Sequence, residues 1–456
     1  MVRKLHSLAR RFGLLTSTIA MIGCERPFIE LRPPDIEVLS PDLDVVQTER
    51  TITLQIRATS LNEVESVLMN GLPMTQESSD GIFAIDVKLG RGVTSLRIQA
   101  IGSRGTMRSD TLEVVFLPGE SDIAEIRLPA PRGGHTATRL LNGDLLVIGG
   151  SELPTRPAVG EALLFSAASL SSSPETISTG TPRMEHTATR LPNGNVLIIG
   201  GSTVAEPTLI EQLVETVELY QTGLGKILAV PVAGDPVRRS GHTTVLFPVR
   251  RNGQVEVFLY LYGGFGDVAY RPVPRMGIRA DLRVFQFRND SLVAVGPTFG
   301  PFIEAIADHA VAAIRLPVGS DADYLFGGAY FAAEDNFDTF AFESNFSTVT
   351  GIRIDDLDPM SQPRTGHAAG RMVDGEVIIF GGRTFGRTTA MGSIEVYYSS
   401  VKRFFPFRPD VSMLQERWGH TVTNWDGDRI LLLGGFGFAG AGLTNSEWFV
   451  VEPRRQ

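Results

Sequence analysis

The chain has 456 residues, enough for two or three domains, and its 48 glycines and 27 prolines occur beside 43% hydrophobic residues. This composition favours a turn-rich all-β fold over disorder. The formal net charge of −9, with no basic run, excludes a nucleic-acid binder, and no apolar stretch reaches the roughly 18 residues that span a bilayer.

Residues 1–23 have the features of a secretory signal. A basic start is followed by a short, mostly apolar stretch and then by Cys24, the only cysteine of the chain. The sequence Met21-Ile22-Gly23-Cys24 resembles the lipobox of bacterial lipoproteins, which implies cleavage before Cys24 and a lipid on its sulfur. We therefore expect a cell-envelope protein that is anchored to a membrane through Cys24, with the leaflet left open. The alternative is an ordinary secretory signal followed by an unused cysteine.

The next two segments differ in pattern. Residues 24–35 contain prolines and no periodicity, so we interpret them as a tether. From 36 to 118, short segments with apolar residues at every second position alternate with turns such as Asn70-Gly71 and Asp80-Gly81, which predicts a small β-sandwich. The stretch VESVLMNG and the later DGIFAIDVKLGRGVTSLRIQAIG are similar to bacterial immunoglobulin-like modules.

The region 119–456 repeats one plan six times. In each repeat, a first strand begins at a histidine and is followed by a turn. A second, apolar strand then ends in a Gly-Gly pair. A third strand and a weaker fourth strand usually follow. Four strands repeated in this way predict a six-bladed β-propeller. The repeat histidines are His135, His186, His242, His309, His367 and His420.

These repeats resemble kelch repeats. The Gly-Gly pairs at 149/150, 200/201, 263/264, 327/328, 381/382 and 434/435 match the hallmark of that family, although the fourth repeat lacks the Pro-Arg before its histidine. The resemblance implies that each histidine and its neighbouring arginine pack or hydrogen-bond within or between blades. Placed one per blade around a wide ring, the histidines are expected to be structural and not to bind a metal, and we expect no cofactor.

The two ends of the repeat region predict how the ring closes. The last repeat ends after a third strand at 446–451, and residues 123–129 precede the first repeat without belonging to it. Because a propeller must cover the edges of its first and last blades, we predict that 123–129 pairs beside 446–451 and completes the sixth blade.

The loops that follow the Gly-Gly pairs carry the candidate binding residues. Equivalent loops emerge on one face of a propeller, and here they are rich in aromatic and arginine side chains. These are Arg156, Tyr270, Arg271, Tyr330, Phe331, Arg383, Phe385, Arg387, Phe436 and Phe438. If exposed, they would form a binding surface, and if folded back, they would form the cores of the loops.

We therefore predict a monomeric, non-catalytic lipoprotein in which an immunoglobulin-like spacer lifts a propeller that binds a protein or a glycan. The alternative is a carbohydrate-active propeller enzyme, epimerase-like, mutarotase-like or lyase-like, with its site in the central funnel. That enzyme needs a carboxylate base and an arginine, and Glu304, Glu334 and Arg383 are candidates. Carboxylates beside an arginine at the funnel mouth favour the enzyme, whereas an uncharged aromatic rim favours binding.

Overall fold

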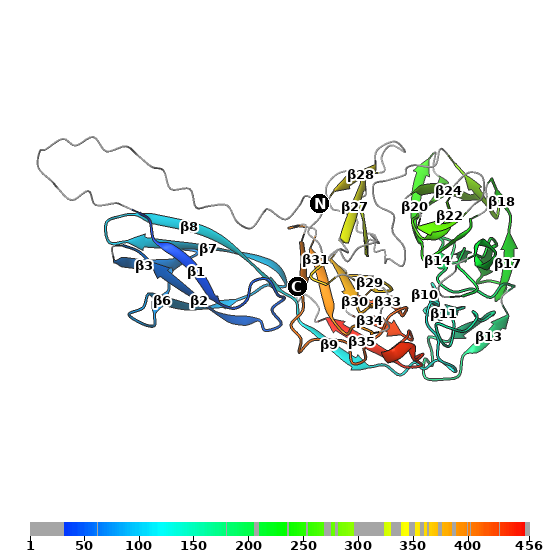
Figure 1. The fold of residues 1–456 in the computed structure, drawn as a ribbon, viewed down its shortest axis with the longest axis horizontal. Coiled ribbons are helices and arrows are strands. Elements are labelled where there is room, and N and C mark those ends of the chain that lie inside the picture. The colour runs from blue at the N-terminus through cyan, green and yellow to red at the C-terminus, as the bar shows by residue number, and fades with distance from the viewer. Residues whose placement is uncertain are drawn as a thin grey trace, which may run out of the picture.

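A computed structural model describes residues 32–451 except 62, 179, 205–208, 235–236, 252–253, 269–274, 279–280, 296–322, 330–338, 346–351, 356–359, 363, 373–375, 385–388, 399, 402 and 428. The described strands form a β-sandwich beside a ring-shaped β-propeller (Figure 1). Cys24 and the predicted signal lie outside the described residues. Within the described part, no helix has the length and apolar character that crossing a membrane requires.

The sandwich consists of two four-stranded sheets. One has the order β1 (Asp35–Ser40), β2 (Thr51–Thr59), β6 (Ile82–Lys88), β5 (Thr75–Gln76), and the other β4 (Leu72–Pro73), β3 (Val64–Met69), β7 (Gly92–Gly102), β8 (Met107–Phe116). Alternate residues of each strand point inward, so that Leu54 and Ile56 of β2 share one core with Leu96 and Ile98 of β7. The strand order is compatible with the immunoglobulin-like module, which stays a prediction.

The propeller is built from six small sheets that follow the six repeats. Blade one contains β10 (Thr136–Arg139), β11 (Leu145–Ile148), β12 (Glu161–Phe165) and β13 (Glu175–Ser178), and blade two contains β14 (Thr187–Arg190), β15 (Val196–Ile199), β16 (Val217–Gln221) and β17 (Lys226–Val230). Blade three contains β20 (Thr243–Arg251), β21 (Gln254–Tyr262), β24 (Leu282–Arg288) and β25 (Ser291–Ala294), with β18 (Val232–Ala233) added in parallel to β25. A separate small sheet joins β19 (Arg239–Ser240), β22 (Phe265–Val268) and β23 (Arg275–Ile278).

The remaining blades complete the ring. Blade four contains β26 (Asp323–Ala329), β27 (Thr339–Asn345) and β28 (Ile352–Asp355), while His309 lies outside the described residues. Blade five contains β29 (Ala368–Arg371), β30 (Val377–Phe380), β31 (Ile394–Tyr398) and β32 (Arg403–Pro406). Blade six contains β33 (Thr421–Asp426), β34 (Arg429–Leu433) and β35 (Ser446–Val451), with β9 (Gly119–Ile123) as its outermost strand.

The Gly-Gly pairs bring neighbouring blades into close contact. In blade one, Gly149 and Gly150 follow β11 with φ angles of 62° and 90°, a region that side chains disfavour. A Cβ atom on Gly149 would lie 2.1 Å from the backbone oxygen of Arg183 in blade two. The pair is therefore required by the approach of the next blade as well as by the turn itself.

The ring closes by a strand from before the first repeat. β9 runs antiparallel to β35, with Gly119 opposite Val451 and Ile123 opposite Glu447. The prediction named the correct partner but the wrong strand, since pairing begins at Gly119 and not at residue 123. The apolar residues Ala124, Ile126 and Leu128 are instead buried between blades six and one. Apolar residues occupy every second position of this extended segment because one of its sides fills the space between the blades.

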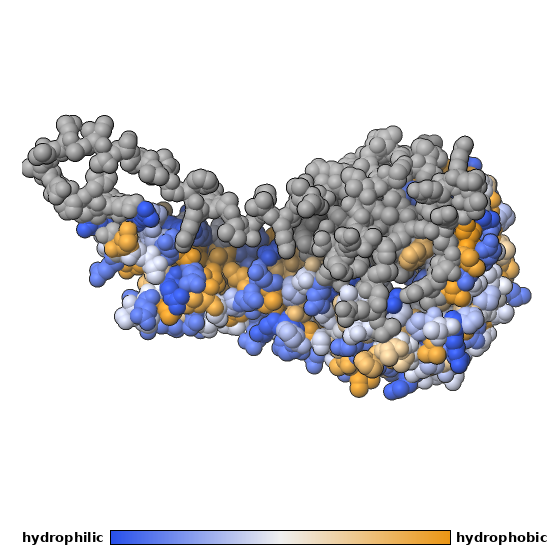
Figure 2. Space-filling view, in the orientation of Figure 1, coloured by the Kyte–Doolittle hydropathy of each residue, from blue (hydrophilic) through white to orange (hydrophobic). Residues whose placement is uncertain are grey.

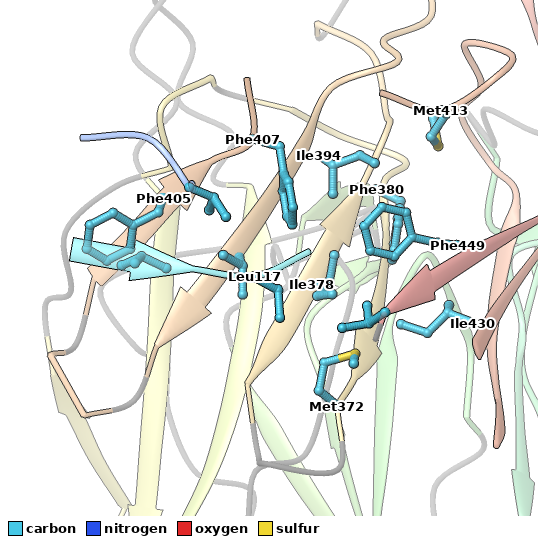
Figure 3. Close-up of a cluster of buried hydrophobic side chains, with 14 of the residues drawn as sticks. Leu117, Met372, Ile378, Phe380, Ile394, Phe405, Phe407, Met413, Ile430 and Phe449 are labelled. Atoms are coloured by element: carbon cyan, nitrogen blue, oxygen red, sulfur yellow. The ribbon is translucent and has the colours of Figure 1, made fainter. Parts of the chain in front are cut away.

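The sandwich packs directly on the propeller. Val46, Val115 and Leu117 of the sandwich side join one buried cluster with side chains of blades five and six, among them Phe405 and Phe449 (Figure 3). The backbone N–H of Val46 donates to the Pro406 carbonyl oxygen at 2.9 Å. On the described surface that Figure 2 shows, hydrophobic residues are interspersed among hydrophilic ones on both bodies.

Candidate functional site

A buried arginine fixes the Gly-Gly turn in repeats one, two, three, five and six. Arg183 donates from Nη1 to the carbonyl oxygen of Gly200, at 2.9 Å, and its Nη2 lies 2.9 Å from Oε2 of Glu218 on the third strand of the same blade. The equivalent arginines and their acidic partners are Arg132 with Glu161, Arg239 with Asp281, Arg364 with Glu395, and Arg417 with Glu447. Each arginine thus connects the Gly-Gly turn with an acidic side chain of its own blade, and its guanidinium group has a structural role.

The residues that precede the histidines form a chain of backbone hydrogen bonds around the propeller axis. Gly419 donates to the carbonyl of Gly366, Gly134 to Gly419, and Glu185 to Gly134, each at 2.7 Å, and Gly241 donates to Glu185 at 2.9 Å. All five residues have φ between 54° and 67°. Glycine adopts this conformation without strain, so Glu185 in blade two is the exception among the described repeats.

This chain surrounds an axial cavity of about 140 Å³. Its wall includes one histidine from each described repeat: His135, His186, His242, His367 and His420. The expectation that the histidines stand apart around a wide ring is wrong for these five, because the first strand of each blade lies next to the axis and carries its histidine there. Even so, no group of three histidine, cysteine, aspartate or glutamate side chains in the described ranges is arranged to hold a metal ion.

His186 and His242 are held by threonines of the preceding blade. Nε2 of His186 lies 2.8 Å from Oγ1 of Thr136, and Nε2 of His242 lies 3.2 Å from Oγ1 of Thr187. Burial, with the nearby charge of Arg132 as a second cause, lowers the pKa of His135 to about 3, and burial likewise lowers the pKa of His186 well below its usual value. These rings are therefore neutral, and a neutral imidazole can share a hydrogen bond with a hydroxyl group.

Arg383 and two aromatic residues form one side of the cavity wall. The guanidinium carbon of Arg383 lies 3.9 Å from the ring centroid of Trp418, and the Trp418 and Phe436 rings are 4.6 Å apart at 46°. Glu185 of blade two lines the same cavity, and its Oε2 accepts a hydrogen bond from Oγ of Ser240 at 3.0 Å. The wall thus combines a cation, a carboxylate and aromatic surface.

The candidate binding residues have different positions in the structure. Arg383 and Phe436 are buried in the cavity wall, so for Phe436 the folded-back alternative applies. Phe438, two residues later, is 80% exposed, and Arg156 is exposed and pairs with Glu152 at 2.7 Å. The other members of the set lie outside the described residues: Tyr270, Arg271, Tyr330, Phe331, Phe385 and Arg387. So do Glu304 and Glu334.

The sequence interpretation missed Glu185 and Trp418. Both lie in the short segment between the repeat arginine and the repeat histidine. An alignment of the repeats against each other contains the signal, because Glu185 stands where Gly134, Gly241 and Gly419 stand in other blades. A side chain that replaces glycine at a left-handed position beside the axis marks a candidate site residue.

Comparison with known proteins supports the fold. No family model matches the sequence, and no curated protein sequence matches it. The solved structure of YjhT is similar, with a TM-score of 0.52 at 15% identity over 72% of this chain and 100% of YjhT. A protein of unknown function from Dyadobacter fermentans matches with a TM-score of 0.49 at 10% identity over 73% of this chain and 98% of its own. A fungal alcohol oxidase in complex with copper matches with a TM-score of 0.45 at 16% identity over 90% of this chain and 73% of the oxidase. At such identities the similarity to YjhT concerns the propeller fold alone.

Proposed function

We propose that the chain is a lipid-anchored cell-envelope protein whose kelch-type propeller binds a glycan without catalysing a reaction. The observation that carries this proposal is the exposed aromatic ring of Phe438, on the loop that also supplies Phe436 to the axial cavity. An aromatic side chain held in water by a structured loop next to a concave site is typical of binding surfaces.

The loop that carries Phe438 is well defined. Phe438–Gly440 form a short 3-10 helix, and Ala439 within it has a φ of 54°, which a side chain adopts only when its surroundings impose it. Gly440 lies against Pro154 of blade one. The loop is therefore fixed at the boundary between blades six and one, so little conformational freedom would be lost when Phe438 contacts a partner.

Between a glycan and a protein partner, the cavity favours the glycan. A volume of about 140 Å³ can admit one sugar unit, and its wall offers both apolar rings and polar groups. Phe438 could then stack on the next unit of the same glycan. A protein partner would need a broad surface of roughly 800 Å² on each side, for which the described loops supply only isolated exposed apolar side chains.

The test is binding of the full-length chain, kept in detergent, to an array of oligosaccharides. Phe438→Ala should weaken binding by roughly 30-fold, which corresponds to about 2 kcal/mol for a central aromatic contact. Leu224→Ala is the matched control, because Leu224 is also exposed but lies between the outer strands β16 and β17 of blade two. The proposal would be refuted if no glycan on the array binds, or if Phe438→Ala binds the glycan with unchanged affinity.

A carbohydrate-active enzyme is the second candidate, and one observation favours it. Glu185 and Arg383 line the same cavity, which places a carboxylate and a guanidinium where the enzyme alternative requires them. Glu185 would act as the base and Arg383 would orient the substrate. Turnover of free sugars, followed by NMR and abolished by Glu185→Gln, would establish this activity, and its absence would leave binding as the function.

A further inference from the structure

The hydroxyl that supports a repeat histidine is missing from the sequence in two blades. Thr136 and Thr187 bond the histidine of the following blade, and Thr421 of blade six lies with its Oγ1 3.4 Å from Nε2 of His135. At the equivalent position, directly after the repeat histidine, blade four has Ala310 and blade five has Ala368. The boundary between blades five and six therefore lacks the hydroxyl that is present at the three boundaries just named.

His420 belongs to blade six and therefore lacks this support from blade five. Among the described residues, neither its Nδ1 nor its Nε2 has a hydrogen-bond partner, although the side chain is only 6% exposed. Nε1 of the neighbouring Trp418 likewise has no partner in the described part of the chain, at 4% exposure. Buried polar groups of this kind are costly to leave unpaired, so they indicate that something else pairs with them. Both side chains line the axial cavity.

His420 can also bind a ligand without losing a hydrogen bond to a described residue of the protein. Turning it toward the cavity breaks no hydrogen bond with a described residue, whereas turning His186 or His242 would break one to a threonine. Burial, and after it the charge of Arg417, lowers the pKa of His420 well below its usual value, so the ring is neutral. A neutral imidazole both donates and accepts one hydrogen bond, which matches a hydroxyl group.

We propose that the axial cavity is a subsite for one neutral sugar unit, whose hydroxyl groups bind His420 and the indole N–H of Trp418. A ligand hydroxyl then gives His420 the hydrogen bond that threonine hydroxyls give His186 and His242. This inference rests on the glycan-binding function proposed above and names the part of the glycan that enters the cavity. At two other blade boundaries a hydroxyl group likewise meets a histidine ring.

The experiment uses the full-length chain in detergent, with glucose, galactose, mannose and N-acetylglucosamine as separate probes, followed by saturation-transfer NMR. Ala368→Thr restores the missing hydroxyl from within the protein. It should raise Tm by roughly 1–2 °C and weaken binding of the sugar that binds best by about tenfold. Trp418→Phe, which removes the donor and keeps a ring, should also weaken binding. The matched control is Leu141→Ala, at an exposed side chain of blade one, which should change neither Tm nor affinity.

The outcomes separate this subsite from the wider proposal. If no neutral monosaccharide binds, or if Ala368→Thr raises Tm and leaves affinity unchanged, the gap beside His420 holds water and the inference is wrong. If oligosaccharide binding depends on Phe438 but not on Ala368→Thr or Trp418→Phe, the glycan-binding function stands and the subsite does not. If Phe438→Ala has no effect while Ala368→Thr does, the cavity is the site and the outer surface is not.

Discussion

Truncating Leu117 to alanine should destabilise the propeller, although this residue follows the last strand of the sandwich. Leu117 is 1% exposed and belongs to the buried cluster that also contains Phe405 and Phe407 of the blade-five side and Phe449 of blade six. Its side chain thus fills space between the two bodies (Figure 3). If the sandwich were a spacer on a hinge, nothing in the propeller would depend on this side chain.

The expected loss follows from the packing. Replacing a fully buried leucine with alanine removes its transfer free energy and leaves a cavity, which together cost about 2–5 kcal/mol. The backbone hydrogen bond from Leu117 N to Gln47 O, at 3.0 Å, does not involve the side chain and should persist. A value of about 3 kcal/mol is reasonable, because rigid aromatic rings surround the site and collapse little. The Phe380 and Phe449 rings, for example, meet edge to face with centroids 5.2 Å apart.

Tryptophan fluorescence offers a suitable assay. The three tryptophans of the chain, Trp418, Trp425 and Trp448, all belong to the sixth repeat, so their emission reports the unfolding of blade six and not of the sandwich. In urea, Leu117→Ala should shift the tryptophan transition to lower denaturant. The control Leu141→Ala, at a side chain that is 66% exposed, should change stability by less than about 0.5 kcal/mol. A tryptophan transition that Leu117→Ala leaves in place would mean that the two bodies unfold independently.

Three further predictions follow from the buried charges and from the N-terminus. His135 has a pKa of about 3 in the folded protein against 6.5 in the unfolded chain. Its neutral ring therefore contributes fully to folding stability above pH 6.5, and this contribution is lost as the pH falls toward 3. In urea titrations, His135→Gln should reduce the slope of stability against pH in this range by about 1.4 kcal/mol per pH unit. Arg417→Ala leaves the buried carboxylate of Glu447 without its ion-pair partner and should lower the free energy of unfolding by about 3–5 kcal/mol in the same titration. Arg429→Ala, at an exposed ion pair, should lower it by less than about 1 kcal/mol. Equal losses in the two variants would contradict the structural role of Arg417. Cys24→Ser should release the protein from the membrane fraction, and retention after a carbonate wash would exclude the lipid anchor.

The amino-acid sequence alone determined the repeat architecture. Each repeat combines a histidine, a turn and a Gly-Gly pair, and these are local requirements: the turn needs residues that tolerate positive φ, and Gly149 and Gly150 need the absence of a Cβ atom. Such requirements recur along the sequence, so the repeat pattern can be recognised without the structure. The partner of the closing strand could be predicted for a similar reason, since β35 would otherwise have a bare edge.

Only the tertiary structure decided which residues meet. Residues 124–128 have the alternation of a strand, but the polar segment 119–123 pairs with β35, because the apolar side chains are needed between blades six and one. Glu185, Arg383 and Trp418 are far apart in the sequence, and the curvature of the ring brings them to one cavity. The alanine at position 368 matters only in the folded ring, where the histidine of the next blade, His420, has no hydrogen-bond partner among the described residues. The sequence of one repeat does not show which side chains of the next blade it will contact. The candidate site is lined by residues from several blades, so only the folded ring reveals it.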